Sequence, residues 1–184
     1  MYFHFGTRKI VEAVAVLLRS DPDHRMGRLR LLKLLYIADR ESLREIGRPI
    51  VGTPLVAMDL GPVHKDVYDL IKGSHYGEEV WAQFIEPVSL DIRLVADPGV
   101  LTLSRYEIDK LNETAATYRE MEDEELATLT HGFEEWIKNH EPNTSKPIPL
   151  EDVVRAVGRV DEEEEILKDA KRVAAFNKLF GVPS

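Results

Sequence analysis

The sequence predicts a mainly α protein, a single compact helical domain of about seven helices with a small β-hairpin. Most of the chain carries apolar residues at the i, i+3, i+4, i+7 spacing of an amphipathic helix. Residues 81–104 instead break into short pieces that are β-rich or alternate between apolar and polar side chains. No linker is long enough to divide the chain, and 184 residues suffice for one domain with a sizeable core.

Two helices are expected in the first quarter of the chain. Thr7 caps the first, which ends before the loop that starts at Asp21. The second begins near Leu29 and ends at Gly47, a residue type well suited to the position that follows a helix. Between Leu29 and Ala38 the apolar residues cover nearly every direction around the helix axis, so we expect this helix to be buried on most sides.

Prolines and glycines shape the next stretch. Residues 48–62 contain three prolines and two glycines, which exclude a long helix and favour an extended connector. A compact third helix is expected to follow, with Pro62 in its first position and Gly73 as its stop.

The middle of the chain predicts the β element and another helix. The turn sequence Asp-Pro-Gly separates the strand-like pieces 90–97 and 100–104, so we expect a hairpin there. Ser104 and Glu107 have the spacing of a capping box, which opens the next helix.

The last third is predicted to be helical. Residues 123–139 form a helical stretch with an interruption near Gly132, and the polar, proline-rich residues 140–149 form a mobile loop. A helix over 150–158 and a last helix over about 162–180 complete the chain. The buried side of the last helix is predicted to comprise Ile166, Leu167, Ala170, Val173, Ala174 and Leu179.

Composition and charge narrow the classes of function. The chain has no cysteine, which excludes disulfides, thiol nucleophiles and thiolate metal sites. We find neither a secretory signal pattern nor an apolar run as long as a membrane span, and we expect a cytoplasmic protein. The net charge of −9 divides into +4 over residues 1–50 and −13 over the remainder. The acidic part repels nucleic acid and suits a basic protein partner, although solubility alone also accounts for it.

The sequence offers no pattern of a catalytic, metal or cofactor site. No two histidines have the spacing of a zinc hydrolase, and His131 with Glu134 or Glu135 would supply at most two ligands on one helix face. There is no nucleophile elbow, P-loop or dinucleotide-binding glycine motif. We therefore expect neither an enzyme nor a bound cofactor or metal.

DNA binding is a more specific alternative function than catalysis. The segment 25–40 carries five basic residues, which are Arg25, Arg28, Arg30, Lys33 and Arg40. A recognition helix needs an exposed polar face, however, and this helix is too apolar to provide one. We expect its cations to pair with the acidic majority, and nucleic acid is not the favoured partner.

The polar end of the second helix admits two interpretations. Tyr36, Asp39 and Arg40 lie within about one turn of each other, and Tyr36 and Arg40 share a face. Asp39 and Arg40 are either a structural pair that ties the helix to the connector or the rim of a recognition surface that includes residues 61–64. The residues alone leave both open.

Two blocks of sequence resemble the Panacea domain of the SocA-like antitoxin family, which also occurs in phage-associated proteins. The first block is "LLKLLYIADRESLREIGRPIVGTPLVAMDLGPVHKDVYDLIKG", and the second is "DEELATLTHGFEEWIK". The family elements in the first are Lys33-Leu34-Leu35-Tyr36, Ala38-Asp39-Arg40, Gly47, Pro49, Ala57, Gly61-Pro62-Val63 and Val67-Tyr68. Those in the second are Leu126, Leu129, Thr130-His131 and Trp136.

The resemblance implies an antitoxin that neutralises a cognate protein toxin, encoded by an adjacent gene, through direct contact. The resemblance also admits two further partners. One is a protease complex that receives the bound toxin, and the other is a second copy of the chain. The family-like domain is expected to span residues 1–141, with a helical extension over 142–184 packed on it. The residues expected to bind the partner are Tyr36, Asp39, Arg40, Gly61, Pro62, His64, Tyr68, His131 and Trp136.

Overall fold

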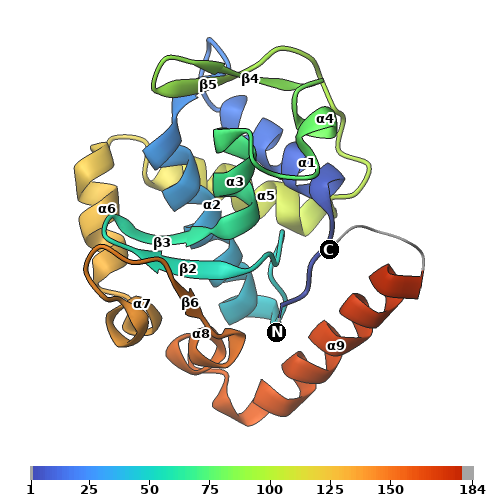
Figure 1. Cartoon of the computed structure of the whole chain (residues 1–184), viewed down its shortest axis with the longest axis vertical. Helices are drawn as coiled ribbons and strands as arrows, with labels where there is room; N and C mark the ends of the chain where they lie inside the picture. Colours follow the sequence, from blue (N-terminus) through green and yellow to red (C-terminus); the bar gives the residue numbers. More distant parts are fainter. Residues whose placement is uncertain (1, 180–184) are drawn as a thin grey trace.

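The computed structural model of the chain describes residues 2–179 and confirms a mainly α architecture with some sheet (Figure 1). The described helices are α1 (Thr7–Leu18), α2 (Arg28–Ile46), α3 (Lys65–Lys72), α4 (Glu78–Trp81), α5 (Arg105–Thr117), α6 (Asp123–His131), α7 (Glu134–Asn139), α8 (Leu150–Ala156), the 3₁₀ turn η1 (Val160–Glu162) and α9 (Glu163–Leu179). The described strands are β1 (Arg25–Gly27), β2 (Leu55–Met58), β3 (Gly61–His64), β4 (Ile85–Val88), β5 (Asp91–Leu94) and β6 (Lys146–Ile148).

Helix α2 lies at the centre of the fold, as its all-round apolar sequence predicts. Every residue from Leu31 to Asp39 is buried. The helix contacts α1, α3, α5, α6 and α8 and the strands β1 and β3. It ends at Gly47, whose φ of 71° continues the chain in the left-handed region without the steric penalty that a side chain would impose.

Two small antiparallel sheets lie on different sides of α2 (Figure 1). One has the strand order β1-β5-β4, and the other has the order β3-β2-β6. In the second sheet Val56 pairs with Val63 on one side and with Pro147 on the other. This sheet joins the middle of the chain to the segment that follows α7.

Residues 48–62 are extended and contain no helix, as expected, but their second half belongs to a hairpin that the sequence did not predict. Strands β2 and β3 pair across a turn at Asp59 and Leu60. Pro62 lies in β3 rather than at the start of a helix, and α3 begins at Lys65. A proline is tolerated there because β3 is an edge strand, where its missing N–H leaves no ladder bond unmade.

The predicted hairpin between 90–97 and 100–104 was also misplaced. The hairpin joins β4 to β5 through Ser89 and Leu90, and Ser89 has a φ of 59°. The turn at Asp97 has another role, since its carboxylate accepts the backbone N–H of Gly99 at 2.7 Å. The other edge of β5 is occupied by β1, which leaves no place there for residues 100–104.

Three further differences concern helix ends and loops. Thr7 is the first residue of α1, and the capping position is Gly6, which has no side chain to form a cap. Residues 140–149 include β6, which pairs with β2. The structure has nine α-helices in its described part instead of about seven, because α4 is an added short helix and 123–139 divides into α6 and α7 at the predicted interruption near Gly132.

Two predictions about helix ends are confirmed and one about burial is corrected. The Ser104 and Glu107 capping box forms both of its hydrogen bonds. Gly73 ends α3 with a φ of 69°. Leu179, assigned to the buried side of the last helix, is 82% exposed, while Phe180 lies outside the described residues.

The core divides into two clusters. The larger one surrounds α1, α2 and α5. The smaller one brings together the two ends of the described chain, because it includes Phe3 as well as Leu150 and Val153 of α8 and Ile166 of α9. Among the described residues, no helix combines the length and apolarity that crossing a bilayer requires.

Candidate functional site

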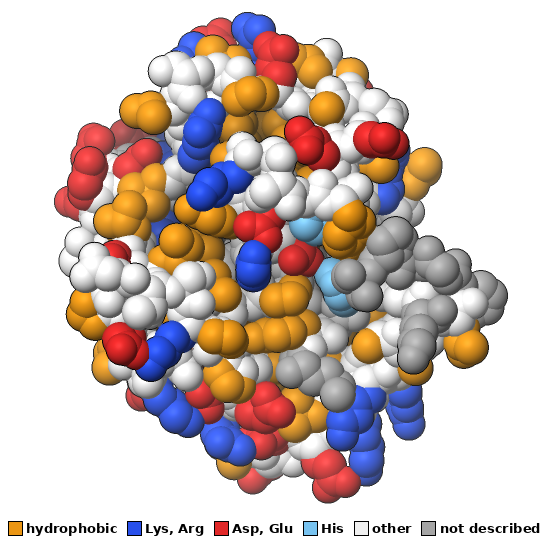
Figure 2. Space-filling model, in the orientation of Figure 1, with side chains coloured by type: hydrophobic (Ala, Val, Ile, Leu, Met, Phe, Trp, Pro, Cys, Tyr) orange, Lys and Arg blue, Asp and Glu red, His pale blue; other side chains and the backbone are white. Residues whose placement is uncertain are grey.

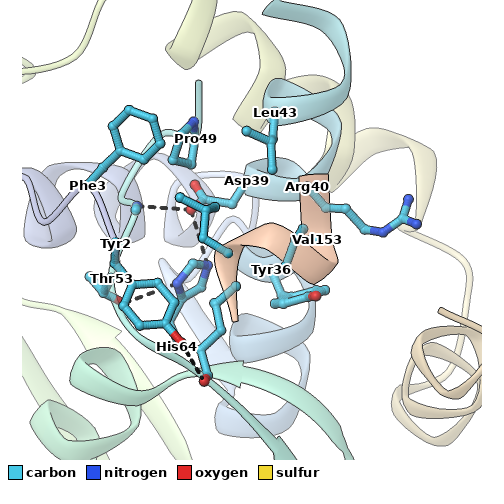
Figure 3. A pocket seen from close by; sticks show the side chains of 13 residues that line it. Tyr2, Phe3, Tyr36, Asp39, Arg40, Leu43, Pro49, Thr53, His64 and Val153 are labelled. Carbon is cyan, nitrogen blue, oxygen red and sulfur yellow. Dashed lines mark hydrogen bonds and ion pairs between the residues drawn. The ribbon is translucent and has the colours of Figure 1, made fainter. Parts of the chain in front are cut away.

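The carboxylate of Asp39 organises the chain that follows α2. Its Oδ1 accepts the backbone N–H groups of Ile50 and Val51 at 2.8 and 2.9 Å, and its Oδ2 accepts that of Gly52 at 3.0 Å. Asp39 is only 5% exposed, so these bonds are shielded from competing water. One carboxylate therefore supplies acceptors to three buried donors; Figure 3 draws Asp39 and, of these three, only the bond to Gly52.

His64 connects this carboxylate to the β2–β3 hairpin. Its Nε2 lies 3.4 Å from Oδ2 of Asp39, and its Nδ1 is hydrogen-bonded to the hydroxyl of Thr53 at 3.1 Å. The ring is 1% exposed. Burial lowers the pKa of His64, because it disfavours the charged imidazolium. The pair thus holds the end of β3 against α2.

Tyr36 and Arg40 converge on Glu135 of α7. The Tyr36 hydroxyl and Nε of Arg40 each donate to Oε1 of Glu135 at 2.8 Å. The Arg40 guanidinium also lies 4.2 Å from the centre of the Phe133 ring, a cation–π distance. Burial and the neighbouring Glu135 carboxylate raise the pKa of Tyr36, so its hydroxyl remains a donor. This triad ties α2 to α7.

Residues from both ends of the chain close this buried polar centre. A cavity of about 20 Å³, enough for about one water molecule, is lined by Asp39 and His64. Phe3, which precedes α1, and Val153 of α8 complete its wall (Figure 3). Arg40 points away from the cavity in the same view. A cavity this small holds no organic ligand.

Lys33 lies buried beneath the β2–β3 hairpin. Its ammonium donates to the carbonyl of Pro62 at 2.9 Å, and the residue is 0% exposed. Burial lowers the pKa of Lys33 to about 7. Gly61 allows this close approach, because a Cβ on Gly61 would collide with the Thr130 hydroxyl and lie 2.9 Å from the Lys33 ammonium.

Replacing Lys33 with methionine is expected to stabilise the protein, most strongly below about pH 7. In the unfolded chain this lysine has an ordinary pKa of 10.5, so wild-type stability rises with pH between about 7 and 10.5 as the native lysine loses its proton first. The advantage of the variant should therefore shrink across that window, by about 5 kcal/mol at most. Urea unfolding of both proteins from pH 6.5 to 9.5 measures it. Lys72→Met is the exposed control, and an equal advantage at both pH limits would contradict the assignment.

Aromatic rings next to the hairpin turn form a stack on the surface. The Trp136 ring lies 4.3 Å from the rings of both His131 and His140. Its indole N–H donates to the carbonyl of Met58 at 2.9 Å, and His140 bonds to Asp59 at 2.9 Å. The stack fixes the position of the β2–β3 turn.

A groove runs beside this turn and has a volume of about 620 Å³. It lies among the first turns of α2, the β2–β3 hairpin, α3 and residues 143–145. Gly61 and Tyr68 line it. The groove thus includes two of the residues predicted to bind a partner.

The structure divides the nine predicted partner-binding residues into two groups. Those buried in the described structure are Tyr36, Asp39, Gly61, Pro62 and His64. Those with partial exposure are Arg40, Tyr68, His131 and Trp136. The first group offers almost no surface to a partner and holds the fold together. The second group has the exposed surface that direct contact with a partner requires.

Each basic side chain of the segment 25–40 is engaged within the protein. The partners are Asp91 for Arg25, the carbonyl of Ser89 for Arg28, Asp123 for Arg30, the carbonyl of Pro62 for Lys33 and Glu135 for Arg40. Reaching a phosphate backbone would require these side chains to leave internal partners.

Sequence reasoning missed two contributors to the site. Glu135 entered only as a weak metal-ligand candidate, yet it is 1% exposed and receives both Tyr36 and Arg40. The residues one helical turn from Glu135 are also polar, so the sequence did not indicate that Glu135 is buried. The second is the turn at Asp59 and Leu60, which falls inside the predicted connector. In the described part of the chain, no three His, Asp or Glu side chains are arranged to hold a metal ion.

The comparison with protein families decides the assignment. The model of the family described as "Antitoxin SocA-like, Panacea domain" matches residues 31–137, which is more than half of the chain. The chain belongs to this family. No curated protein and no solved structure matches it significantly. The Panacea match begins inside α2 and ends inside α7, so it includes Asp39, His64 and Glu135 but neither Phe3 nor α8.

Proposed function

We propose that the protein is the antitoxin of a toxin–antitoxin pair, acting in the cytoplasm without catalysis or cofactor. It would bind a protein toxin encoded by an adjacent gene and mask it by direct contact. The family match over residues 31–137 is the observation that carries this proposal. The DNA-binding alternative is not carried forward, because the basic side chains of the segment 25–40 have internal partners.

The face around the β2–β3 turn is the proposed contact surface. It carries the partly exposed Tyr68, His131 and Trp136 together with Leu60, which is 59% exposed. The buried Asp39–His64 pair and the buried Glu135, which Tyr36 and Arg40 contact, would fix the shape of this face. A rigid scaffold of this kind reduces the ordering cost of binding.

Co-expression with the product of the adjacent reading frame tests the proposal. The neighbour alone is expected to arrest growth, and growth should return when this protein is produced with it. The two proteins should also co-elute in size-exclusion chromatography. A harmless neighbour, or arrest that persists while this protein is present and folded, would overturn the proposal.

Toxin abundance separates two modes of neutralisation. An immunoblot during rescue should show a constant amount of toxin, because masking by contact leaves the toxin intact. A falling amount would instead indicate delivery to a protease. The empty vector provides the reference level.

A further inference from the structure

Side-chain donors hold the β2–β3 turn and the residues on either side of it. The buried Lys33 donates to the carbonyl of Pro62 at 2.9 Å, and the indole N–H of Trp136 donates to that of Met58 at 2.9 Å. Figure 2 shows hydrophobic side chains gathered over β3 and the adjoining part of α2, which is where Lys33 is covered. The position of the turn therefore depends on a few side chains, and one of them is a lysine shut away from water.

Two histidines flank the Trp136 ring beside this turn. The rings of His131 and His140 each lie 4.3 Å from it, at interplanar angles of 15° and 20°. His140 is also bonded to the Asp59 carboxylate at 2.9 Å. The buried Nε2 of His131, in contrast, has no hydrogen-bond partner in the described structure. A charged His131 would thus have one buried N–H without an acceptor.

The charged and titratable groups around Lys33 do not neutralise it. Asp59 and Tyr68 line the same groove, and the Asp59 carboxylate is already bonded to a histidine. Glu135 of α7 is bonded to two side chains of α2. Burial lowers the pKa of Lys33 to about 7. Burial and the neighbouring Lys33 also lower the pKa of His131, while a hydrogen bond with the backbone of Asp59 opposes this shift.

We propose that the β2–β3 turn is a pH-sensitive element that opens as the solution becomes more acidic. The closed turn keeps Lys33 and His131 away from water and favours their neutral forms, whereas the open turn lets both carry a hydrated charge. The pKa of Lys33 is about 7 in the closed turn and an ordinary 10.5 in water, so opening becomes easier as the pH falls from 10.5 to about 7. His131 adds a second contribution below its ordinary pKa of 6.5.

Opening would change the proposed contact surface, because Leu60 lies in the turn and is 59% exposed. A partner that fits the closed turn would bind more weakly in acid, and this consequence rests on the proposed function. The opening itself concerns this chain alone. It is measured on the isolated protein, whereas the antitoxin proposal is tested by co-expression, so the two can fail separately.

Hydrogen exchange of the Trp136 indole N–H, measured by NMR on the whole protein, reports the opening, because this group is bonded to Met58 beside the turn. The spectrum of Trp136→Phe distinguishes its signal from that of Trp81. After correction for the pH dependence of the chemical exchange step, the opening constant of the wild type should rise about tenfold between pH 8 and pH 6. At pH 8 it should exceed the unfolding constant from urea denaturation at least about tenfold.

Removing the titratable groups should remove this rise. Lys33→Met should show a rise of at most about fourfold, the limit that His131 sets between these two pH values. The double variant Lys33→Met/His131→Phe, which keeps an aromatic ring beside Trp136, should change by less than about twofold. His24→Asn is the matched control, because His24 is exposed and lies outside the turn, and it should keep the wild-type rise.

Two results would overturn the pH-sensitive turn directly. One is a wild-type opening constant that changes by less than about twofold, and the other is a rise that persists in the double variant. An opening constant equal to the unfolding constant would overturn it as well, because the turn would then move only when the whole domain unfolds. The antitoxin proposal would stand in each of these cases.

Discussion

Replacing Asp39 with alanine is expected to abolish stable folding. The change removes the acceptors of three buried backbone N–H groups, those of Ile50, Val51 and Gly52. Each buried donor left without an acceptor costs about 1–3 kcal/mol, so the total loss for the three is about 3–9 kcal/mol. That is comparable to the whole free energy of unfolding of a typical domain, about 5–15 kcal/mol. Urea unfolding monitored by circular dichroism measures the loss.

Two control variants test whether the loss of stability comes from the missing hydrogen-bond acceptors. Asp39→Asn keeps one side-chain oxygen as an acceptor, so its loss of stability should be intermediate. Asp109→Ala changes a carboxylate that is 66% exposed and should stay within about 0.5 kcal/mol of wild type. If Asp39→Ala instead retained wild-type stability but failed to rescue growth, Asp39 would be a partner contact and the structural interpretation would be wrong.

Replacing Gly61 with alanine is expected to be almost as damaging. Gly61 has a φ of 100°, in the region that a side chain disfavours. The new Cβ would also collide with the Thr130 hydroxyl and press on the Lys33 ammonium. Backbone strain and overpacking together should cost about 3–5 kcal/mol. Thermal and urea unfolding of the variant measure this cost.

Gly99 is the matched control for Gly61. Its φ of 74° is also positive, but a Cβ there would meet nothing within 4 Å. Gly99→Ala should therefore carry the backbone cost alone, about 1–2 kcal/mol. Equal losses in the two variants would show that the collision beneath the hairpin contributes nothing.

The helical part of the fold could be predicted because its information is local. The apolar periodicity of α2 and the glycines that end α2 and α3 are signals that depend only on residues nearby in the sequence. The Ser104 and Glu107 capping box is equally local. These features appeared where the sequence placed them.

The strands depended on pairing between distant segments, which no local pattern reveals. Strand β2 pairs with β6, about ninety residues further along the chain, and β1 pairs with β5. Proline also misled the prediction at position 62, because an edge strand and the first turn of a helix both tolerate it. The same sequence signal thus served two different structures.

The sequence drew attention to the polar residues of α2, but the contacts that these residues make could not be predicted from it. In the middle of α2, Tyr36 and Arg40 contact Glu135, whereas Asp39 accepts the backbone N–H groups of residues 50–52. The burial of Glu135 follows from the packing of α7 rather than from its own neighbours in sequence. The three-dimensional structure was therefore needed to interpret Asp39 as a structural residue.

The closure of the polar centre by Phe3 and α8 limits how the domain can be excised. The matched stretch 31–137 contains Tyr36 but not Phe3, Leu150 or Val153, which cover it. A fragment cut at those boundaries would expose an apolar surface to water and remove the residues that shield the Asp39 carboxylate. Such exposure favours aggregation. The stretch that matches the family model is therefore smaller than the unit expected to fold alone, and an expression fragment of this protein should reach from residue 2 through α9.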